Sequence, residues 1–414
     1  MNKVSKQLAI HGGKPAAGDM TSKNPDYGLK TGANEFLALA EAFGYSASAL
    51  EEIRRIAERE DSGIDPMMMR YYARDVSRVD AFEAFSRELF GAEHALAVNS
   101  GTSALIAALA GAEIGPGDEV IVPGYTFLAS AAAVLAVGAT PVVADIDDTL
   151  MLDPAAAESW ITPKTRAIMP VHMQGGCADM DGISALARRH GLKVIEDNAQ
   201  SCGGRYRGRW LGTLGDAGCF SFSSVKIVGC GEGGLVLSDD AWLMTRARSQ
   251  HDTAGCWRED RYAEALQPGE LFGGENYRMS ELEGAVNLAQ LRRMPEQAER
   301  YRKTSRAVME ALPEFSATRV RPSNDPEGDI GHILFLMAES GSVATDIAEA
   351  LGAEGLDASA RGDSDRRDWH LYTYWDHLLP PESISVDRCP NVLDLTRRAI
   401  RIRIHQGWTE NDCE

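Results

Sequence analysis

The sequence predicts an α/β protein with two structural parts. The larger part is a mostly parallel sheet flanked by helices, and a smaller α+β domain follows it. Three observations predict this arrangement: short apolar runs alternate with helical patterns from residue 79 to residue 240, polar and glycine residues cluster at the ends of those runs, and the pattern changes near residue 300. Strands that alternate with helices pair in parallel and are buried on both faces of their sheet.

The composition is that of a globular protein with an acidic surface. The 414 residues include 42 Lys and Arg and 61 Asp and Glu, which gives a net charge of −19. Such a charge disfavours binding to nucleic acid or to an anionic membrane. The seven cysteines form no Cys-x-x-Cys pair, and no apolar stretch suits a secretory signal or a membrane span. We therefore expect a cytoplasmic protein with reduced thiols.

The N-terminal region is expected to contain an arm and one helix. Residues 1–30 are rich in Lys, Gly and Pro, so we predict a loosely structured arm. Residues 46–62 begin with a serine that can cap a helix and carry apolar residues at helical spacing. We assign residues 31–299, including this helix, to the large domain.

Strands and helices then alternate along the large domain. Buried-strand patterns are found within residues 94–101, 118–125, 140–147, 165–175, 192–200, 216–224 and 233–240. Helical periodicity covers residues 79–92, 102–114, 126–138 and 180–191. Because ligands bind beyond the carboxyl ends of the strands in such sheets, the residues that follow these strands are candidates for a site.

Residues 300–414 are predicted to form the smaller α+β domain. An irregular polar and aromatic stretch occupies residues 363–379. The expected elements on either side of it are helices over residues 301–315 and 343–355 and strands over residues 332–338 and 397–405.

The first strand of the large domain is followed by the segment Asn-Ser-Gly-Thr-Ser, residues 99–103. In this segment a glycine precedes two hydroxyl residues, Thr102 and Ser103. A helix N-terminus carries unpaired N–H groups and the positive end of the helix dipole, so it binds phosphate well. The alternative interpretation is a plain N-cap by Thr102 or Ser103. Asp197 ends another apolar strand. A carboxylate there can pair with a protonated ring nitrogen, bind a metal or cap the next loop.

Lys226 is the candidate nucleophile. It precedes a glycine-rich stretch, residues 229–234, and glycines allow close backbone approach and positive φ. Most lysines are surface residues, but a lysine whose pKa is lowered by burial or by a nearby cation forms Schiff bases. A phosphate site, a carboxylate for a ring nitrogen and an amine for an aldehyde are the groups that pyridoxal phosphate requires. No Cys/His spacing indicates a metal site.

Six motifs, in this order, resemble those of the DegT/DnrJ/EryC1/StrS sugar aminotransferases, a branch of the fold-type I, aspartate-aminotransferase-like enzymes that use pyridoxal 5′-phosphate. The resemblance is strong from residue 80 to residue 300 and weaker from there to residue 414. The motifs occupy residues 99–105, 117–147, 170–175, 194–204, 221–234 and 276–291.

The resemblance implies roles for individual residues. Lys226 matches the lysine of the internal aldimine, and Asp197 matches the partner of the pyridinium nitrogen. Gln200 matches the residue beside the ring hydroxyl, and Phe127 matches the aromatic residue that stacks on the cofactor. The residues that match cofactor-phosphate contacts are Thr102, Ser103 and Ser221, together with Asn276 from the neighbouring subunit of a homodimer with shared sites. Gly101, in the same segment, is assigned to cofactor binding.

The activity that the resemblance implies is transfer of an amino group from glutamate or glutamine to a keto sugar, keto cyclitol or related ketone, in amino sugar, antibiotic or polysaccharide biosynthesis. A dehydratase of the same family is one alternative, although its known deoxygenating enzyme replaces the lysine by histidine. A catalytically silent regulator with the same fold is another. The stretch 361–379 and the end of the chain at residue 414 depart from the family pattern, so the ketone stays open.

For several histidines the sequence leaves both a structural role and contact with a ligand open. His172 and His251 fall in family-like segments and suit either structural hydrogen bonding or substrate contact. His370 and His377, beside Trp369, suit a core or interface role better than a ligand.

Overall fold

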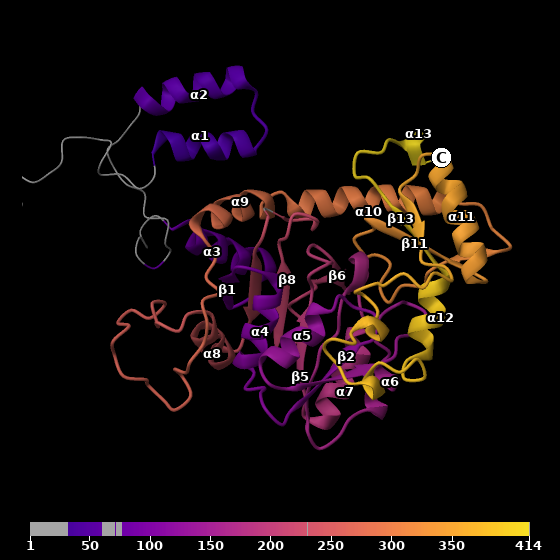
Figure 1. Cartoon of the computed structure of the whole chain (residues 1–414), viewed down its shortest axis with the longest axis horizontal. Coiled ribbons are helices and arrows are strands. Elements are labelled where there is room, and N and C mark those ends of the chain that lie inside the picture. The colour runs from indigo at the N-terminus through magenta and orange to yellow at the C-terminus, as the bar shows by residue number, and fades with distance from the viewer. Residues whose placement is uncertain (1–31, 60–70, 72–76, 230, 414) are drawn as a thin grey trace, which may run out of the picture. The chain divides into compact units, whose positions relative to one another are not determined.

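The computed structural model describes residues 32–59, 71, 77–229 and 231–413, and the chain divides into two compact units, residues 1–68 and 69–414 (Figure 1). The predicted arm at residues 1–30 lies outside the described residues. The predicted domain boundary at residue 300 concerns the second unit alone and stays a prediction.

The described part of the first unit is a pair of helices, α1 (Ala33–Ala42) and α2 (Ala47–Arg59). The turn between them contains Gly44, whose φ of +82° lies in the left-handed region. Ser46 Oγ accepts a hydrogen bond from the Ala49 N–H at 3.3 Å, as the cap of a helix does. The helix predicted in this region is therefore confirmed as α2.

A seven-stranded sheet forms the centre of the second unit, with the strand order β1-β9-β8-β5-β4-β2-β3. The pairs from β8 to β3 are parallel, and β9 is antiparallel to both of its neighbours. This arrangement confirms the predicted mostly parallel sheet. Its strands are β1 (His94–Val98), β2 (Glu119–Pro123), β3 (Thr140–Ala144), β4 (Thr165–Ile168), β5 (Lys193–Asp197), β8 (Ala217–Ser221) and β9 (Gly234–Ser238).

Both faces of this sheet are buried. Successive side chains of a strand point to opposite faces, and Cys219 and Val236 pack into one apolar cluster while Phe220 and Leu235 pack into another. The predicted helices are confirmed, with ends displaced by at most a few residues. The helices of this part are α3 (Arg78–Phe90), α4 (Gly101–Gly111), α5 (Ala129–Ala136), α6 (Pro154–Ser159), α7 (Met180–His190), α8 (Ala241–His251) and α9 (Glu281–Leu291).

A smaller antiparallel sheet follows, with the order β10-β11-β13-β12. Figure 1 shows α9 and α10 running one after the other from the large sheet toward this small sheet. The predicted strands and helices of this region are confirmed. The elements are α10 (Met294–Ala311), β10 (Thr318–Val320), β11 (Ile333–Ala338), α11 (Gly341–Ala353), β12 (Ala358–Ala360), α12 (Pro390–Arg398), β13 (Ala399–Arg403) and α13 (Glu410–Cys413).

The remaining regular elements are short. The strands β6 (Arg205–Tyr206) and β7 (Arg209–Trp210) pair with each other. Single 3₁₀ turns cover residues Met173–Gly175, Tyr372–Tyr374 and Pro381–Ser383. The stretch 363–379 is otherwise irregular, as predicted.

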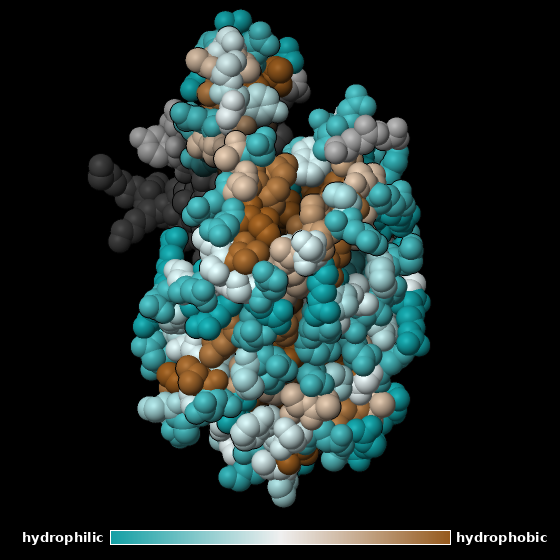
Figure 2. Space-filling view, turned by 90° about the vertical axis from the view of Figure 1, so that its right-hand side faces the viewer, coloured by the Kyte–Doolittle hydropathy of each residue, from teal (hydrophilic) through white to brown (hydrophobic). Residues whose placement is uncertain are grey.

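The surface is largely polar where it can be seen from one side. Figure 2 shows hydrophilic residues over most of one face, with one larger hydrophobic patch and a few small ones apart from it. Among the helices of the described residues, none has the length and apolar composition that a membrane crossing requires.

Candidate active site

A cavity of about 390 Å³ lies at the carboxyl edge of the large sheet. Its walls come from the first turn of α4, the segment that links β2 to α5, the end of β5 and the loop between β8 and β9. Parallel strands end on the same edge, which is why segments so distant in the sequence meet here. The predicted site residues that line the cavity are Gly101, Thr102, Phe127, Asp197, Gln200, Ser221 and Lys226.

Lys226 lies in the loop between β8 and β9. Burial lowers the pKa of its ammonium group, and the charge of Asp197 opposes this effect. Within the described residues, the Lys226 side chain makes no hydrogen bond or ion pair. A partly buried lysine with a lowered pKa and no carboxylate bonded to it is suited to nucleophilic and base chemistry.

The glycines beside Lys226 are required by the shape of this loop. Gly229 lies so close to Ser223 that a Cβ atom would collide with the Ser223 carbonyl oxygen. Gly233 has a φ of +145°, and its carbonyl oxygen accepts a hydrogen bond from the Phe222 N–H at 2.8 Å. The loop therefore folds back on itself, with Lys226 in the part between these contacts.

Asp197 is 5% exposed at the end of β5. Its Oδ2 accepts a hydrogen bond from Ser130 Oγ at 2.7 Å, and its Oδ1 accepts one from the Ala199 N–H at 3.1 Å. Burial raises the pKa of this carboxyl, while the two hydrogen bonds and the charge of Lys226 favour the ionised form. A cation beside Asp197 would be strongly attracted in this buried setting.

The first turn of α4 meets the end of β8 at very short range. A Cβ atom on Gly101 would lie 2.6 Å from the Ser221 Cβ, so only glycine fits here. The cap of α4 is Ser100, whose Oγ accepts a hydrogen bond from the Ser103 N–H at 3.1 Å. The alternative that Thr102 or Ser103 caps the helix is therefore wrong, and the Thr102 side chain lines the cavity.

Ser103 itself is not brought to the cavity. Its hydroxyl donates to Asn99 Oδ1 at 2.7 Å, and the side chain is 6% exposed. The predicted phosphate contact of Ser103 stays a prediction that the described geometry does not favour.

Phe127 is 45% exposed and faces a histidine that the sequence did not identify as a site residue. The rings of Phe127 and His370 have centroids 5.5 Å apart, and His370 lines the same cavity. Main-chain hydrogen bonds explain this: the Thr126 N–H donates to the His370 carbonyl oxygen and the Leu128 N–H to that of Trp369, each at 3.0 Å. The irregular stretch therefore forms part of the site wall.

Gln200 meets a second residue that sequence reasoning missed. The Gln174 N–H donates to Gln200 Oε1 at 3.2 Å, which leaves the Gln200 amide nitrogen available to donate. Gln174 has a φ of +53°, which is uncommon outside glycine. A family-like motif spans it, but nothing in the local pattern indicates this conformation.

Asn276 does not line the cavity of its own chain. The side chain is exposed, and its Oδ1 accepts a hydrogen bond from the Arg278 N–H at 3.3 Å. Its predicted contact with a phosphate requires a second subunit, and that role stays a prediction.

His172 and His251 are both fully buried and have structural partners. His172 Nε2 lies 3.1 Å from Glu196 Oε2, and its Nδ1 accepts a hydrogen bond from the Ala178 N–H at 3.2 Å. His251 Nε2 lies 2.8 Å from the Tyr71 hydroxyl. Neither residue lines the cavity, so both serve the structure.

A second pocket of about 260 Å³ adjoins the cavity and shares Gln200, Lys226 and His370 with it. Its other wall belongs to the small sheet, through His332, which precedes β11, and through Arg401 and Arg403 of β13. The sequence predicted these strands but identified no site residue on them. Lys226 is therefore reached from both pockets.

Comparison with known proteins gives matches over most of the chain. The model of the DegT/DnrJ/EryC1/StrS aminotransferase family matches residues 55–414. The chain is 44% identical over 220 residues to a GDP-perosamine synthase from Caulobacter vibrioides, in a match that covers 52% of this chain and 56% of that protein. It therefore spans about half the length of this relative.

Two further matches extend over more of the chain. An L-glutamine:2-deoxy-scyllo-inosose aminotransferase from Streptoalloteichus tenebrarius is 37% identical over 297 residues, which are 69% of this chain and 67% of that protein. The crystal structure of S. venezuelae DesV in complex with a ketimine intermediate matches with a TM-score of 0.70 and 31% identity, over 88% of this chain and 93% of that one.

Proposed function

Because this chain belongs to the DegT/DnrJ/EryC1/StrS aminotransferase family, we propose that it moves an amino group from glutamate or glutamine to a keto sugar, keto cyclitol or related ketone, with pyridoxal phosphate as cofactor. The names of the relatives support this range of acceptors. One is a GDP-perosamine synthase, and another acts, by its name, between L-glutamine and 2-deoxy-scyllo-inosose.

The side chains of the cavity fit this cofactor. Thr102, Ser221 and the N–H groups of the first turn of α4 would hold its phosphate, since Gly101 and Thr102 at that helix end line the cavity. Asp197 would keep the ring nitrogen protonated, and Phe127 would lie against the ring. When bound, pyridoxal phosphate supplies the electron sink that stabilises negative charge on a substrate carbon.

Lys226 is the base in the mechanism that we propose. Its amine would hold the cofactor when no substrate is bound. Lys226 Nζ would also be the group that removes a proton from the donor Cα and that returns a proton to the acceptor carbon when the ketone is aminated.

Exposed residues outside the cavity support a homodimer with shared sites. Asn276 is exposed, and the segment before it, between α8 and α9, extends away from the sheet in Figure 1. In this segment Tyr262 is 82% exposed and Leu266 is 90% exposed. Apolar side chains that stand so far out of the surface are suited to contact with another subunit.

The observation that carries this proposal is Lys226, unpaired in the described residues, in a cavity with the buried carboxylate of Asp197. The test is a half-reaction. The purified protein with bound cofactor is mixed with each amino acid in turn, and the cofactor absorbance and the 2-oxo acid product are followed. Glutamate or glutamine should convert the cofactor with one equivalent of product per site. No conversion with any amino acid would contradict an aminotransferase.

A further inference from the structure

Two hydroxyl groups form a continuous series of hydrogen bonds with the Asp197 carboxylate. Thr126 Oγ1 lies 2.7 Å from Ser130 Oγ, and Ser130 Oγ donates to Asp197 Oδ2 at 2.7 Å. Thr126 and Ser130, the hydroxyl pair, are both fully buried, and Asp197 is 5% exposed. Because water does not compete for these bonds, each is stronger than it would be at the surface.

The hydrogen bonds of the hydroxyl pair run in one direction. An ionised carboxylate only accepts, so the single hydroxyl proton of Ser130 is used toward Asp197. The short contact between the two hydroxyls then requires Thr126 to donate to Ser130 and not to the Phe127 carbonyl oxygen, which is 3.4 Å away. Hydrogen bonds in series polarise one another, so Thr126 makes Ser130 a better donor.

The segment between β2 and α5 carries the hydroxyl pair. Thr126 and Ser130 are buried, while Phe127, between them in the sequence, is 45% exposed at the cavity. Ser130 is the second residue of α5, so the positive end of the helix dipole also favours a carboxylate beside it. The Thr126 N–H donates to the His370 carbonyl oxygen. A substitution that removes only the Thr126 hydroxyl therefore leaves this main-chain contact in place.

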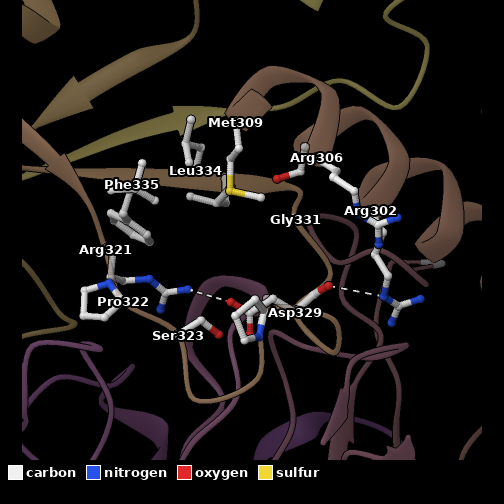
Figure 3. A pocket seen from close by; sticks show the side chains of 15 residues that line it. Arg302, Arg306, Met309, Arg321, Pro322, Ser323, Asp329, Gly331, Leu334 and Phe335 are labelled. Carbon is white, nitrogen blue, oxygen red and sulfur yellow. Dashed lines mark hydrogen bonds and ion pairs between the residues drawn. The ribbon is translucent and has the colours of Figure 1, made fainter. Parts of the chain in front are cut away.

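A second buried carboxylate is stabilised in a different way. Figure 3 shows Arg321 directed at Asp329 in another pocket, and the two side chains lie 3.1 Å apart. Burial raises the pKa of Asp329, and the charge of Arg321 opposes this effect. Within the described residues, Asp197 bonds to one hydroxyl and one N–H and to no basic side chain. The hydroxyl pair therefore favours the charged form of Asp197 and leaves that charge available to a cation.

The hydroxyl of Ser130 is the strongest influence that keeps Asp197 charged. Burial raises the pKa of Asp197, and the Ser130 hydrogen bond opposes this effect more than a main-chain hydrogen bond does. The charges of Lys226 and His172 act in the same direction and contribute less. Cys219 of β8 also faces Asp197, and burial raises the pKa of its thiol, which stays neutral.

We propose that Thr126 and Ser130 are positioning residues, which hold Asp197 in its charged form and in one orientation for the ring nitrogen of the cofactor. This inference rests on the proposed function, in which Asp197 keeps that nitrogen protonated. Neither hydroxyl touches a reacting atom, since both act through the carboxylate. The hydroxyl pair extends the pH range in which Asp197 is charged toward acid, and loss of either hydroxyl moves the limit of that range upward.

The test is binding of 4-deoxypyridoxine 5′-phosphate to the apo-protein between about pH 4.5 and pH 8. This analogue keeps the ring nitrogen and the phosphate but has no aldehyde, so it binds without a bond to Lys226. Its affinity should decline as the pH drops and Asp197 takes up a proton. Asp197→Asn should lose the part of the decline that belongs to the carboxylate. The titrations of the analogue itself are the same for every variant and cancel in the comparison.

Ser130→Ala should raise the midpoint of this decline by about 1–2 pH units, as expected for a carboxylate that loses a charge-assisted hydrogen bond. Thr126→Val should raise it by roughly 0.2–0.5 unit, because Ser130 then donates without the support of the second hydroxyl. Thr126→Ser restores that hydroxyl and should return the wild-type midpoint. The control is Thr396→Val in α12, which removes a buried hydroxyl that donates to a main-chain oxygen at 2.6 Å, and it should change neither midpoint nor affinity.

A purely structural role gives a different result. If the hydroxyl pair only shaped the fold, its loss would weaken analogue binding by the same factor at every pH and leave the midpoint unchanged, and that outcome would overturn the proposal. Thr126→Val decides the question if Ser130→Ala does not fold. Shifted midpoints in a protein that no amino acid converts would support the hydroxyl pair and refute the aminotransferase. A wild type that binds no analogue at any pH would refute both.

Discussion

At the scale of single residues, the fold gives Lys226 and Asp197 different environments, as their proposed roles require. Lys226 stands on a loop whose Gly229 allows a close approach to Ser223 of the same loop, and burial lowers the pKa of Lys226. Asp197 is fixed by Ser130 and the Ala199 N–H at the end of a strand. The lowered pKa of Lys226 suits a group that gains and loses a proton, and the hydrogen bonds of Asp197 hold its carboxylate in one position.

Lys226→Ala should lower the transamination rate by at least roughly 10²- to 10⁴-fold, the usual contribution of a positioned base. No other lysine lines the cavity within the described residues. Borohydride reduction followed by mass spectrometry of the peptides should find the cofactor on Lys226 in the wild type and on no lysine in the variant. Lys193→Ala, which removes a lysine paired with Asp216 at 2.7 Å, is the control and should keep the adduct.

Asp197→Asn should still bind the cofactor but lose most of the activity, because an amide does not hold the ring nitrogen protonated. Ser130→Ala, which removes one of the two hydrogen bonds to this carboxylate, should have a smaller effect in the same direction. Steady-state rates and cofactor titrations measure both. A turnover of Asp197→Asn within a few-fold of the wild type would show that the carboxylate is only structural.

His332 makes the folded protein sensitive to acid. Its pKa falls to about 4 in the folded chain and is about 6.5 in the unfolded chain, so the unfolded state takes up a proton first as the pH drops. Stability should therefore fall between pH 6.5 and pH 4, by up to about 1.4 kcal/mol per pH unit from this group. The charges facing His332 are those of Arg401, Arg403 and Lys226.

Urea unfolding at several pH values compares His332→Gln with the wild type and with His377→Gln, whose side chain is about half exposed. The slope of stability against pH should be shallower in His332→Gln alone. Equal slopes in all three proteins would show that His332 does not couple folding to protonation.

At the scale of elements, the contact between α4 and β8 shapes the end of the cavity where a phosphate would bind. Gly101→Ala should push α4 away from Ser221, lower the free energy of unfolding by about 1–3 kcal/mol and weaken cofactor binding. Gly352→Ala, in α11, is the matched control, because a Cβ there meets no atom within 4 Å. It should be neutral or stabilising by ~0.4–1 kcal/mol.

Melting of the apo-proteins and fluorescence titration with the cofactor measure the two effects separately. If Gly101→Ala binds the cofactor as tightly as the wild type, the position of α4 does not control the phosphate site.

The elements were predictable where their patterns are local. Strands such as β5 and β8 are apolar runs, and helices such as α7 have a clear period, so the order of elements and the cavity residues at their ends follow from the sequence. The wall that the small sheet contributes to the second pocket was not predictable in this way. Arg401 alternates with isoleucines as in any half-buried strand, and its pocket forms only when β13 lies near the loop of Lys226.

The place of His370 beside Phe127 could not be predicted from the sequence for a related reason. The stretch that contains it has no period, and the hydrogen bonds that bring it to Phe127 are made by main-chain groups far apart in the sequence. The N-cap of α4 is a second feature that the sequence alone could not predict. Ser100, Thr102 and Ser103 are all able to cap, and only the geometry selects Ser100.

At the scale of the whole molecule, the exposed position of Asn276 leads to a prediction about assembly. If Asn276 reaches the phosphate of a second subunit, Lys226→Ala and Asn276→Asp place their lesions in the same site of a mixed dimer and leave the other site intact. Random pairing makes half of the dimers mixed, each with one intact site, so the mixture should recover up to about a quarter of wild-type activity.

Each variant mixed with itself is the control and should stay inactive. The mixture should be assayed after subunit exchange has been verified with differently tagged chains. Exchange without recovered activity would return Asn276 to its own subunit.

The hydrogen bonds that join residues 369–372 to residues 124–128 are made by the main chain alone: Thr126 donates to His370, Leu128 to Trp369 and Tyr372 to Gly124, at 3.0 Å in each case. Main-chain bonds of this kind do not depend on which side chains the two segments carry. Substitutions in this stretch can therefore change the wall next to Phe127 while the frame that positions the ring stays in place. An enzyme built this way can acquire a new acceptor by changing side chains, with its machinery for moving the proton left untouched.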